Sequence, residues 1–363
     1  MRCNESNFKQ VIILTSIIGL GVYFPALMLY KKFERRGIKA RILTIEKLLT
    51  AEKRNIFLKT KEAFKLNDKL AMIASYMPIT LEDKFDEMQI NKIFDEWKTN
   101  PRSEYICFSA LWLPLLSEYS TSINPINLSC VEIDCSTASI WKQYREYNHM
   151  IKKSYKIWGD KLNYSFELED LGIIPYNNRR EEITIHGGGW DLGNFISILS
   201  FFDTYDYKLN LILNSDKRHD DISEARNIVI YQNDQDWNPL NDDVFPMLRI
   251  ISSSSSQRII EPNSYPAILN VISQSLAIIS KPGGMSLVDS LITETPILFL
   301  DPIGKNEIHN QQIFEKLKLG MTFEEWKNSN FSNRLLQNMN KELKAIKCGI
   351  PDLFKSIYED IYS

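Results

Sequence analysis

The sequence predicts an α/β protein of two domains, each organised around a parallel β-sheet. Three segments carry this prediction, because in each a short apolar run is followed by glycines and then by a second apolar or amphipathic run. The three segments begin at Val11, Ile183 and Leu276. Continuous apolar runs of this length are typical of strands that are buried on both faces. A chain of 363 residues is long enough for two domains that each bury a core of their own.

Changes in composition along the chain predict the domain boundaries. The N-terminal domain is expected to cover residues 1–165, including a helical excursion at 45–100, and the C-terminal domain residues 183–345. Residues 166–182 form the expected linker, and residues 346–363 hold a final helix.

The opening segment, Val11–Tyr30, has no charged residue and is long enough to cross a membrane. Gly19, Gly21 and Pro25 interrupt it, so we predict a buried strand, a glycine loop and the start of a helix. Farther along the chain, aromatic residues between positions 140 and 162 are spaced as on one face of a helix, and a helix is predicted there.

The overall composition narrows the class of protein. A net charge of −3 argues against a nucleic-acid-binding protein, which usually carries a basic excess. The five cysteines have no metal-binding or redox spacing, which suits a reducing cytoplasm. We therefore expect a cytoplasmic protein that binds no metal and makes at most peripheral contact with a membrane.

The segment 280–310, SKPGGMSLVDSLITETPILFLDPIGKNEIHN, follows an apolar strand and predicts a glycine turn at the start of a helix. The free N–H groups in the first turn of a helix and its positive dipole end favour a bound anion. An anion site is therefore predicted at Gly283, Gly284, Met285 and Ser286.

A second glycine loop follows the predicted strand 183–186 and contains Gly188 and Gly189. Ligands of open α/β sheets bind where the strands end, so both loops are expected to face one crevice. Two groups beside that crevice could accept a proton: His186 at the end of its strand and Asp134 at the end of the strand 128–133.

The motif SKPGG-x-(S/T)-L, an acid three positions on, and the later P-x-G-…-(Q/N)-E-x-x-N pattern resemble the C-terminal half of GT-B glycosyltransferases. The branch concerned holds the lipid II GlcNAc transferase and the mono- and diglycosyl-diacylglycerol synthases. The clear match covers residues 265–320, and GLGVYFPA after the first strand resembles the start of these enzymes. The resemblance implies two Rossmann-like domains facing a central cleft, with the final helix crossing back onto the N-terminal domain.

The resemblance also implies roles for particular residues. The diphosphate would bind at Gly283–Ser286, with Gly188 and Gly189 also on the nucleotide side. Asp289 would accept hydrogen bonds from the ribose, and the backbone of Ile260 would pair with the uracil edge. Asn306, Glu307 and Asn310 would bind the hydroxyls of the donor sugar. No cofactor is implied beyond the nucleotide sugar, which acts as a co-substrate.

The sequence departs from the family at one position, since Val22 stands where these enzymes carry a catalytic histidine. Asp134 is the first candidate for the base, with Tyr23 and His186 as the others.

The function implied is inverting transfer of a hexose-type sugar from a UDP or TDP donor to a small-molecule or lipid acceptor. Two alternatives stay open because of Val22. One is a different reaction on the same fold, by a nucleotide-sugar epimerase or a transferase of a non-sugar group. The other is a non-catalytic nucleotide-binding partner.

Overall fold

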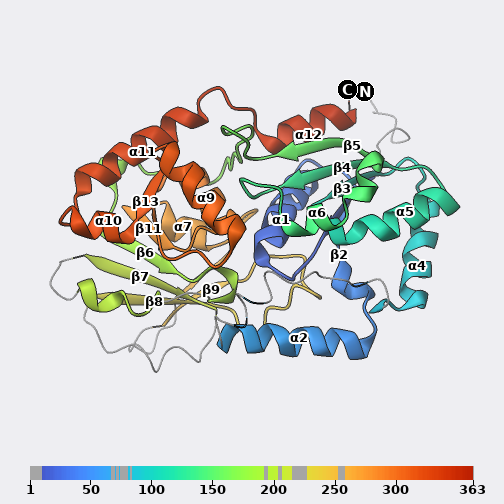
Figure 1. Cartoon of the computed structure of the whole chain (residues 1–363), viewed down its shortest axis with the longest axis horizontal. Helices are drawn as coiled ribbons and strands as arrows, with labels where there is room; N and C mark the ends of the chain where they lie inside the picture. The colour runs from blue at the N-terminus through green and yellow to red at the C-terminus, as the bar shows by residue number, and fades with distance from the viewer. Residues whose placement is uncertain are drawn as a thin grey trace.

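The chain folds into two α/β domains that lie side by side along the long axis of the molecule (Figure 1). The structure, a computed structural model, describes residues 10–66, 70, 73, 81, 84–191, 195–202, 207–214, 227–251 and 258–362.

The N-terminal domain is built on a five-stranded sheet in the order β2-β1-β3-β4-β5, and every strand pair in it is parallel. The strands are β1 (Val11–Thr15), β2 (Ala40–Thr44), β3 (Glu104–Cys107), β4 (Asn127–Glu132) and β5 (Ile151–Lys156). All five residues of the interior strand β1 are buried, as its unbroken apolar sequence predicts.

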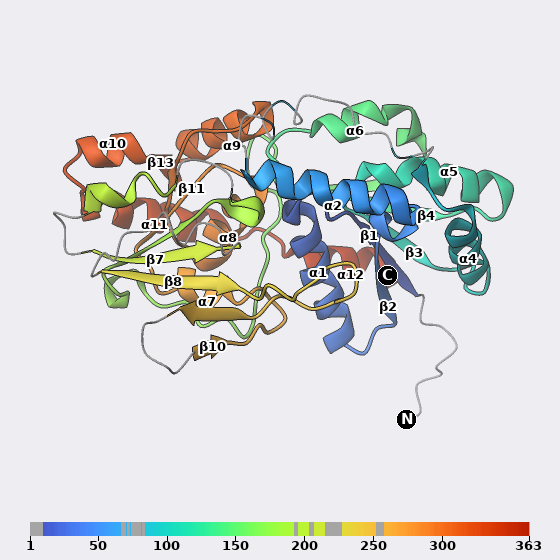
Figure 2. The ribbon, with the colours of Figure 1, turned by 90° about the horizontal axis from the view of Figure 1, so that it is seen from below.

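Helices follow the strands of this domain in sequence. They are α1 (Leu20–Arg35), α2 (Ala51–Leu66), α4 (Glu87–Lys98), α5 (Leu113–Ser122) and α6 (Ser139–Gln143), with short 3-10 helices at 45–48, 110–112 and 145–150. The strand, glycine loop and helix predicted for 11–30 are confirmed by β1 and α1. Of the expected helical excursion at 45–100, α2 and α4 are described, and α2 lies along one side of the molecule (Figure 2).

The helix predicted for residues 140–162 is wrong. Only α6 and one 3-10 helix occupy the start of that range, and the chain then enters β5, the edge strand of the sheet. In β5 the side chain of Tyr155 is buried, while Lys152, Lys153 and Ser154 are exposed. An edge strand exposes most of its side chains, so β5 lacks the unbroken apolar run that identifies a buried strand. The helical spacing of the aromatic residues was then the stronger local signal, and it led to the wrong prediction.

The C-terminal domain holds an eight-stranded sheet in the order β10-β9-β8-β7-β6-β11-β12-β13. Six strands are parallel, while β9 pairs antiparallel with both β8 and β10, so the sheet is mixed. The strands are β6 (Glu182–His186), β7 (Lys208–Leu213), β8 (Ile228–Asn233), β9 (Leu248–Ile251), β10 (Arg258–Ile260), β11 (Ala277–Ser280), β12 (Ile297–Phe299) and β13 (Gly320–Thr322).

The helices of the C-terminal domain are α7 (Ile268–Ile272), α8 (Gly284–Thr293), α9 (Lys305–Lys316), α10 (Phe323–Asn328) and α11 (Asn333–Lys347), with short 3-10 helices at 176–178, 188–190 and 199–202. The predicted unit of strand, glycine turn, helix and strand is confirmed by β11, α8 and β12.

The last helix, α12 (Leu353–Tyr362), lies against the N-terminal domain (Figure 1). Its Phe354 ring packs on Phe33 of α1 with ring centroids 5.0 Å apart, and Asp360 contacts Tyr155 of β5. One apolar cluster runs from the first sheet through α1 to α8 and the second sheet, so the two domains share a continuous core. None of the helices in the described ranges is long and apolar enough to cross a membrane.

Candidate functional site

Two glycine loops meet at the same edge of the second sheet. β6 and β11 are parallel neighbours, so Gly187–Gly189 after β6 and the turn before α8 both lie at the carboxyl ends of their strands. Gly188 has a φ of +71°, a left-handed backbone conformation that glycine adopts without strain. A Cβ atom at Gly189 would lie 2.7 Å from the Leu20 side chain, so this glycine permits the close approach of α1.

Between the two domains is a cavity of about 390 Å³, which we call the cleft cavity. Its N-terminal wall comes from the loops after β1, β3 and β4, and its C-terminal wall from the two glycine loops and the start of α9. The residues used below from its lining are Gly19, Gly21, Val22, Glu132, Asp134, Ser136, Gly188, Gly189, Lys281, Gly283, Gly284, Met285, Ser286, Asn306 and Glu307.

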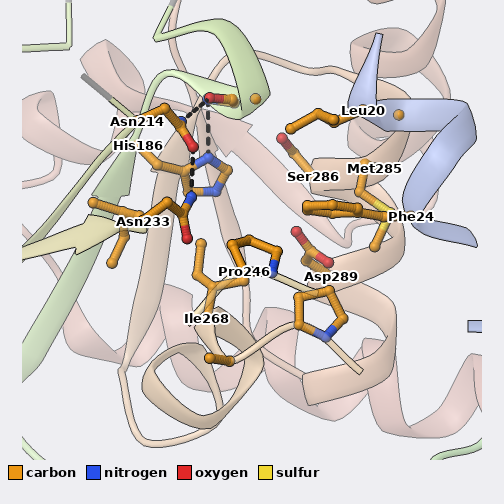
Figure 3. A pocket seen from close by; sticks show the side chains of 16 residues that line it. Leu20, Phe24, His186, Asn214, Asn233, Pro246, Ile268, Met285, Ser286 and Asp289 are labelled. Atoms are coloured by element: carbon orange, nitrogen blue, oxygen red, sulfur yellow. Dashed lines mark hydrogen bonds between the residues drawn. The ribbon is translucent and has the colours of Figure 1, made fainter. Parts of the chain in front are cut away.

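A smaller cavity of about 70 Å³ adjoins it, which we call the side pocket. The two cavities share the residues Gly21, Gly188, Gly189, Met285 and Ser286. The side pocket is also lined by Phe24, His186, Asn214, Asn233, Pro246, Ile268 and Asp289 (Figure 3).

The start of α8 lies where the sequence predicts an anion site. Gly283 is the N-cap residue and makes no side-chain capping bond, so the first-turn N–H groups are left to other acceptors. Gly283, Gly284, Met285 and Ser286 all line the cleft cavity, at the positive end of a ten-residue helix. The arrangement suits an anion in the cavity.

Lys281 lies between the two glycine loops and lines the cleft cavity, although the sequence did not lead us to predict it as a site residue. Its Nζ is 3.5 Å from the position of a Cβ atom at Gly283 and 3.9 Å from that at Gly188. The ammonium group forms an ion pair with the carboxylate of Glu307, in which both side chains are largely buried. The other carboxylate oxygen of Glu307 accepts the N–H of Ile303 at 2.7 Å. The one basic residue of the SKPGG motif, next to the glycines of the predicted anion site, could have identified this position from the sequence.

Asp134 reaches across from the end of β4 to the start of α8. Its Oδ1 accepts the Asn310 amide at 3.0 Å and lies 2.6 Å from the position of a Cβ atom at Gly284. Burial raises the pKa of this carboxyl, and the neighbouring Glu307 raises it further, while the Asn310 bond lowers it. A carboxylate with a raised pKa is a better general base than an exposed one at neutral pH.

Asn310 is fully buried, and its amide is already bonded within the protein. It accepts the Cys135 N–H at 2.8 Å and donates to Asp134 and to the Pro282 carbonyl, at 3.0 Å each. The side chain therefore joins the N-terminal domain to the turn before α8. Asn306 is the more open member of the segment, since it lines the cleft cavity and its Oδ1 lies 3.5 Å from the Ser136 hydroxyl.

Asp289 points into the side pocket from α8 (Figure 3). The residue is buried, and its Oδ1 has no hydrogen-bond partner among the described residues. Burial raises the pKa of this carboxyl to about 8. A buried carboxyl oxygen without a partner costs free energy unless a ligand supplies a donor, so Asp289 marks the pocket as a place for hydroxyl groups.

His186 also lines the side pocket, where its Nδ1 accepts the Gly188 N–H at 3.1 Å. Its Nε2 has no partner among the described residues. Burial and, to a smaller extent, the charge of Lys281 lower the pKa of the imidazole to about 4. A neutral histidine that holds the second glycine loop fits this geometry better than a base does.

Three other predicted positions lie as follows. Val22 lines the cleft cavity but has no group that can move a proton, whereas Tyr23 is buried and donates its hydroxyl to the Asp242 carbonyl at 3.0 Å. Ile260 ends the outermost strand, β10, and lines neither cavity. In its place Ile268 and Pro246 line the side pocket, in segments that carry no recognisable motif.

Solved structures of glycosyltransferases share this architecture. MurG of Acinetobacter baumannii superposes with a TM-score of 0.55 at 12% identity, covering 97% of this chain and 99% of that chain. VinC, solved in complex with dTDP, gives a TM-score of 0.57 at 8% identity, with coverage of 96% and 98%. UGT2 of Phytolacca americana, solved with UDP-2-fluoroglucose and pterostilbene, gives 0.58 at 6% identity, with coverage of 97% and 98%.

A scan against protein-family models finds no match, and neither does a search of the curated proteins. The structural comparisons establish the GT-B fold, which the chain shares with MurG, VinC and UGT2.

Proposed function

We propose that the protein is an inverting glycosyltransferase that moves a hexose-type sugar from a UDP or TDP donor to a small-molecule or lipid acceptor. One observation carries the proposal. Asp289, a buried residue whose Oδ1 has no hydrogen-bond partner among the described residues, and an open helix N-terminus lie on the same helix, α8, and face two adjoining cavities. A nucleoside diphosphate has hydroxyl groups at one end and an anion at the other, so it matches both.

The assignment of groups follows from this placement. The ribose binds at Asp289 in the side pocket, and the diphosphate lies over Gly283–Ser286. The donor sugar lies toward Asn306 and Glu307, which line the cleft cavity. The known complexes of VinC with dTDP and of UGT2 with UDP-2-fluoroglucose support a nucleoside diphosphate donor by analogy of fold.

Asp134 is the proposed general base, because it lines the cleft cavity from the N-terminal domain and faces the start of α8. In an inverting reaction the acceptor oxygen attacks the anomeric carbon as the diphosphate leaves, and the acceptor proton passes to the base. The helix N-terminus and Lys281 stabilise the leaving diphosphate, so the scheme needs no metal. A cytoplasmic location with at most peripheral membrane contact belongs to the same proposal.

A thermal-shift screen tests the donor assignment. UDP and TDP should raise the unfolding midpoint, because a ligand at about 100 times its Kd stabilises the folded state by about 2.7 kcal/mol. ATP and GTP should leave the midpoint unchanged, because the proposed site does not bind them. Stabilisation by ATP with no effect of UDP would refute the proposal.

A second measurement addresses the alternatives that Val22 favours, since no proton-moving group stands at that place in the cavity. The protein is incubated with nucleotide sugars in the absence of acceptor. Conversion of the donor to an isomeric nucleotide sugar would indicate an epimerase. Binding without turnover under every acceptor tested would indicate a non-catalytic nucleotide-binding protein.

A further inference from the structure

We propose that the Lys281–Glu307 ion pair exchanges partners when the donor binds. The Lys281 ammonium moves from the carboxylate of Glu307 to a phosphate oxygen, and the freed oxygen of Glu307 accepts a hydrogen bond from a donor-sugar hydroxyl. The inference rests on the proposed function and adds a coupling to it: arrival of the diphosphate prepares the sugar site.

The position of Lys281 is the first support. It follows β11 directly, and its ammonium reaches the space between the loops at Gly188 and Gly283, both of which lack a side chain there. Both glycines and Lys281 line the cleft cavity. A diphosphate seated over the start of α8 therefore lies within reach of this ammonium.

The charges of the cavity are the second support. Glu132, Asp134 and Glu307 are the acids among the described residues that line the cleft cavity, and Lys281 is the basic residue among them. Glu132 has a partner outside the lining, Lys156, at 3.1 Å. An anionic diphosphate that enters an acidic cavity competes directly with Glu307 for the Lys281 ammonium, and its phosphate oxygens are strong hydrogen-bond acceptors.

The anchoring of Glu307 is the third support. One carboxylate oxygen pairs with Lys281, while the other accepts the Ile303 N–H at 2.7 Å. Loss of the lysine therefore leaves the carboxylate held by one bond with its second oxygen free. Glu307 lines the cleft cavity beside Asn306, where the proposed function places the donor sugar.

Isothermal titration with uridine, UMP and UDP tests the exchange, using wild type, Lys281→Gln and Glu307→Gln. Lys281→Gln should weaken UDP binding by about tenfold or more and leave uridine binding within about twofold, because only the diphosphate contacts the lysine. Glu307→Gln should strengthen UDP binding by a few-fold, since the lysine loses its competing partner, and yet lower the rate of sugar transfer by about tenfold or more.

Lys305→Gln is the matched control, because Lys305 is exposed at the start of α9 and is absent from the cavity lining. It removes the same charge nearby and should change UDP affinity by less than about twofold. Lys281→Arg, which keeps the charge, should retain most of the difference in affinity between UDP and uridine.

Whether Glu307→Gln strengthens or weakens UDP binding decides between exchange and no exchange of partners, even if Lys281→Gln fails to fold. Weaker UDP binding in Glu307→Gln would mean that the glutamate holds the lysine in place for the phosphate, and the exchange would be refuted. Equal losses of uridine and UDP affinity in Lys281→Gln would also refute it. A wild-type protein that binds neither these three ligands nor TDP would instead overturn the proposed function itself.

Discussion

Replacing Gly284 by alanine should destabilise the protein, although the same change usually stabilises a helix. Gly284 is the first residue of α8 and does not have a positive φ, so its backbone conformation accepts a side chain. In an ordinary helix the change from glycine to alanine gains about 0.5–1 kcal/mol. Here the new Cβ atom would lie 2.6 Å from Oδ1 of Asp134 and 3.3 Å from Cγ2 of Ile133.

The size of the effect follows from what Asp134 must do. A carbon and an oxygen in contact normally stay about 3.3–3.6 Å apart, so the carboxylate has to move by roughly 0.7–1 Å. That movement stretches its 3.0 Å bond to Asn310, the residue that joins the two domains. Overpacking of this kind costs about 1–3 kcal/mol, which outweighs the gain in the helix. We expect a net loss of about 1–2 kcal/mol in the free energy of unfolding.

A double-mutant cycle with Asp134→Ala measures the contact. Urea unfolding gives the free energy of unfolding of wild type, Gly284→Ala, Asp134→Ala and the double variant. In the Asp134→Ala background the alanine at 284 should be neutral or stabilising, so the coupling energy should exceed about 1 kcal/mol. If Gly284→Ala has the same effect in both backgrounds within about 0.5 kcal/mol, the proposed contact across the cleft does not exist.

Three further outcomes are expected. Asp134→Asn should lower kcat for sugar transfer by about 10²-fold or more with UDP affinity retained, and an unchanged kcat at every pH would remove Asp134 from the mechanism. Asn310→Ala should lower the free energy of unfolding by about 1–3 kcal/mol in urea titrations, because it leaves the buried Cys135 N–H without its acceptor; a loss below about 0.5 kcal/mol would contradict this. UDP binding should release a proton below about pH 8, since burial raises the pKa of the Asp289 carboxyl to about 8 and hydrogen bonds from the ribose hydroxyls favour the ionised form. UDP affinity should therefore rise as the pH increases toward 8. Calorimetry in buffers of different ionisation heat measures the released proton, and the Asp289→Asn variant should not release it. Equal release from wild type and variant would exclude Asp289 as the source.

The sequence predicted the buried strands well because burial on both faces demands an unbroken apolar run. β1 and β11, which lie inside their sheets, were found within one or two residues. Edge and short strands lack this signal. β5 has one buried side chain, Tyr155, among exposed lysines, and the hydroxyl of Tyr155 bonds to Asp360 of α12, about 200 residues later. Such a long-range contact cannot be read from local periodicity.

The site was predicted where a motif and a strand end coincide. Both glycine loops line the cleft cavity, as expected from their places after β6 and β11. The role of a polar side chain was harder to predict, because it depends on the groups that the other domain presents. Asn310 matches the sugar-binding asparagine of the resembled family, yet its amide is occupied by Asp134, Cys135 and the Pro282 carbonyl. The spacing of a motif places a residue, whereas its hydrogen-bond partners decide what the residue is free to bind.

The same reasoning shows how the proposed base can come from a different strand than the one that precedes Val22. The strands of the first sheet are all parallel, so the loops after β1, β3 and β4 reach one edge of the sheet and line one cavity. Val22 lies near the start of α1, beyond the loop that follows β1, and Asp134 lies in the loop that follows β4, and both face the C-terminal domain. A proton acceptor lost after one strand can therefore be replaced from another strand without any change in the path of the chain. Because Asn310 holds Asp134 against the start of α8, the proposed base would have its present position only while the two domains keep this contact.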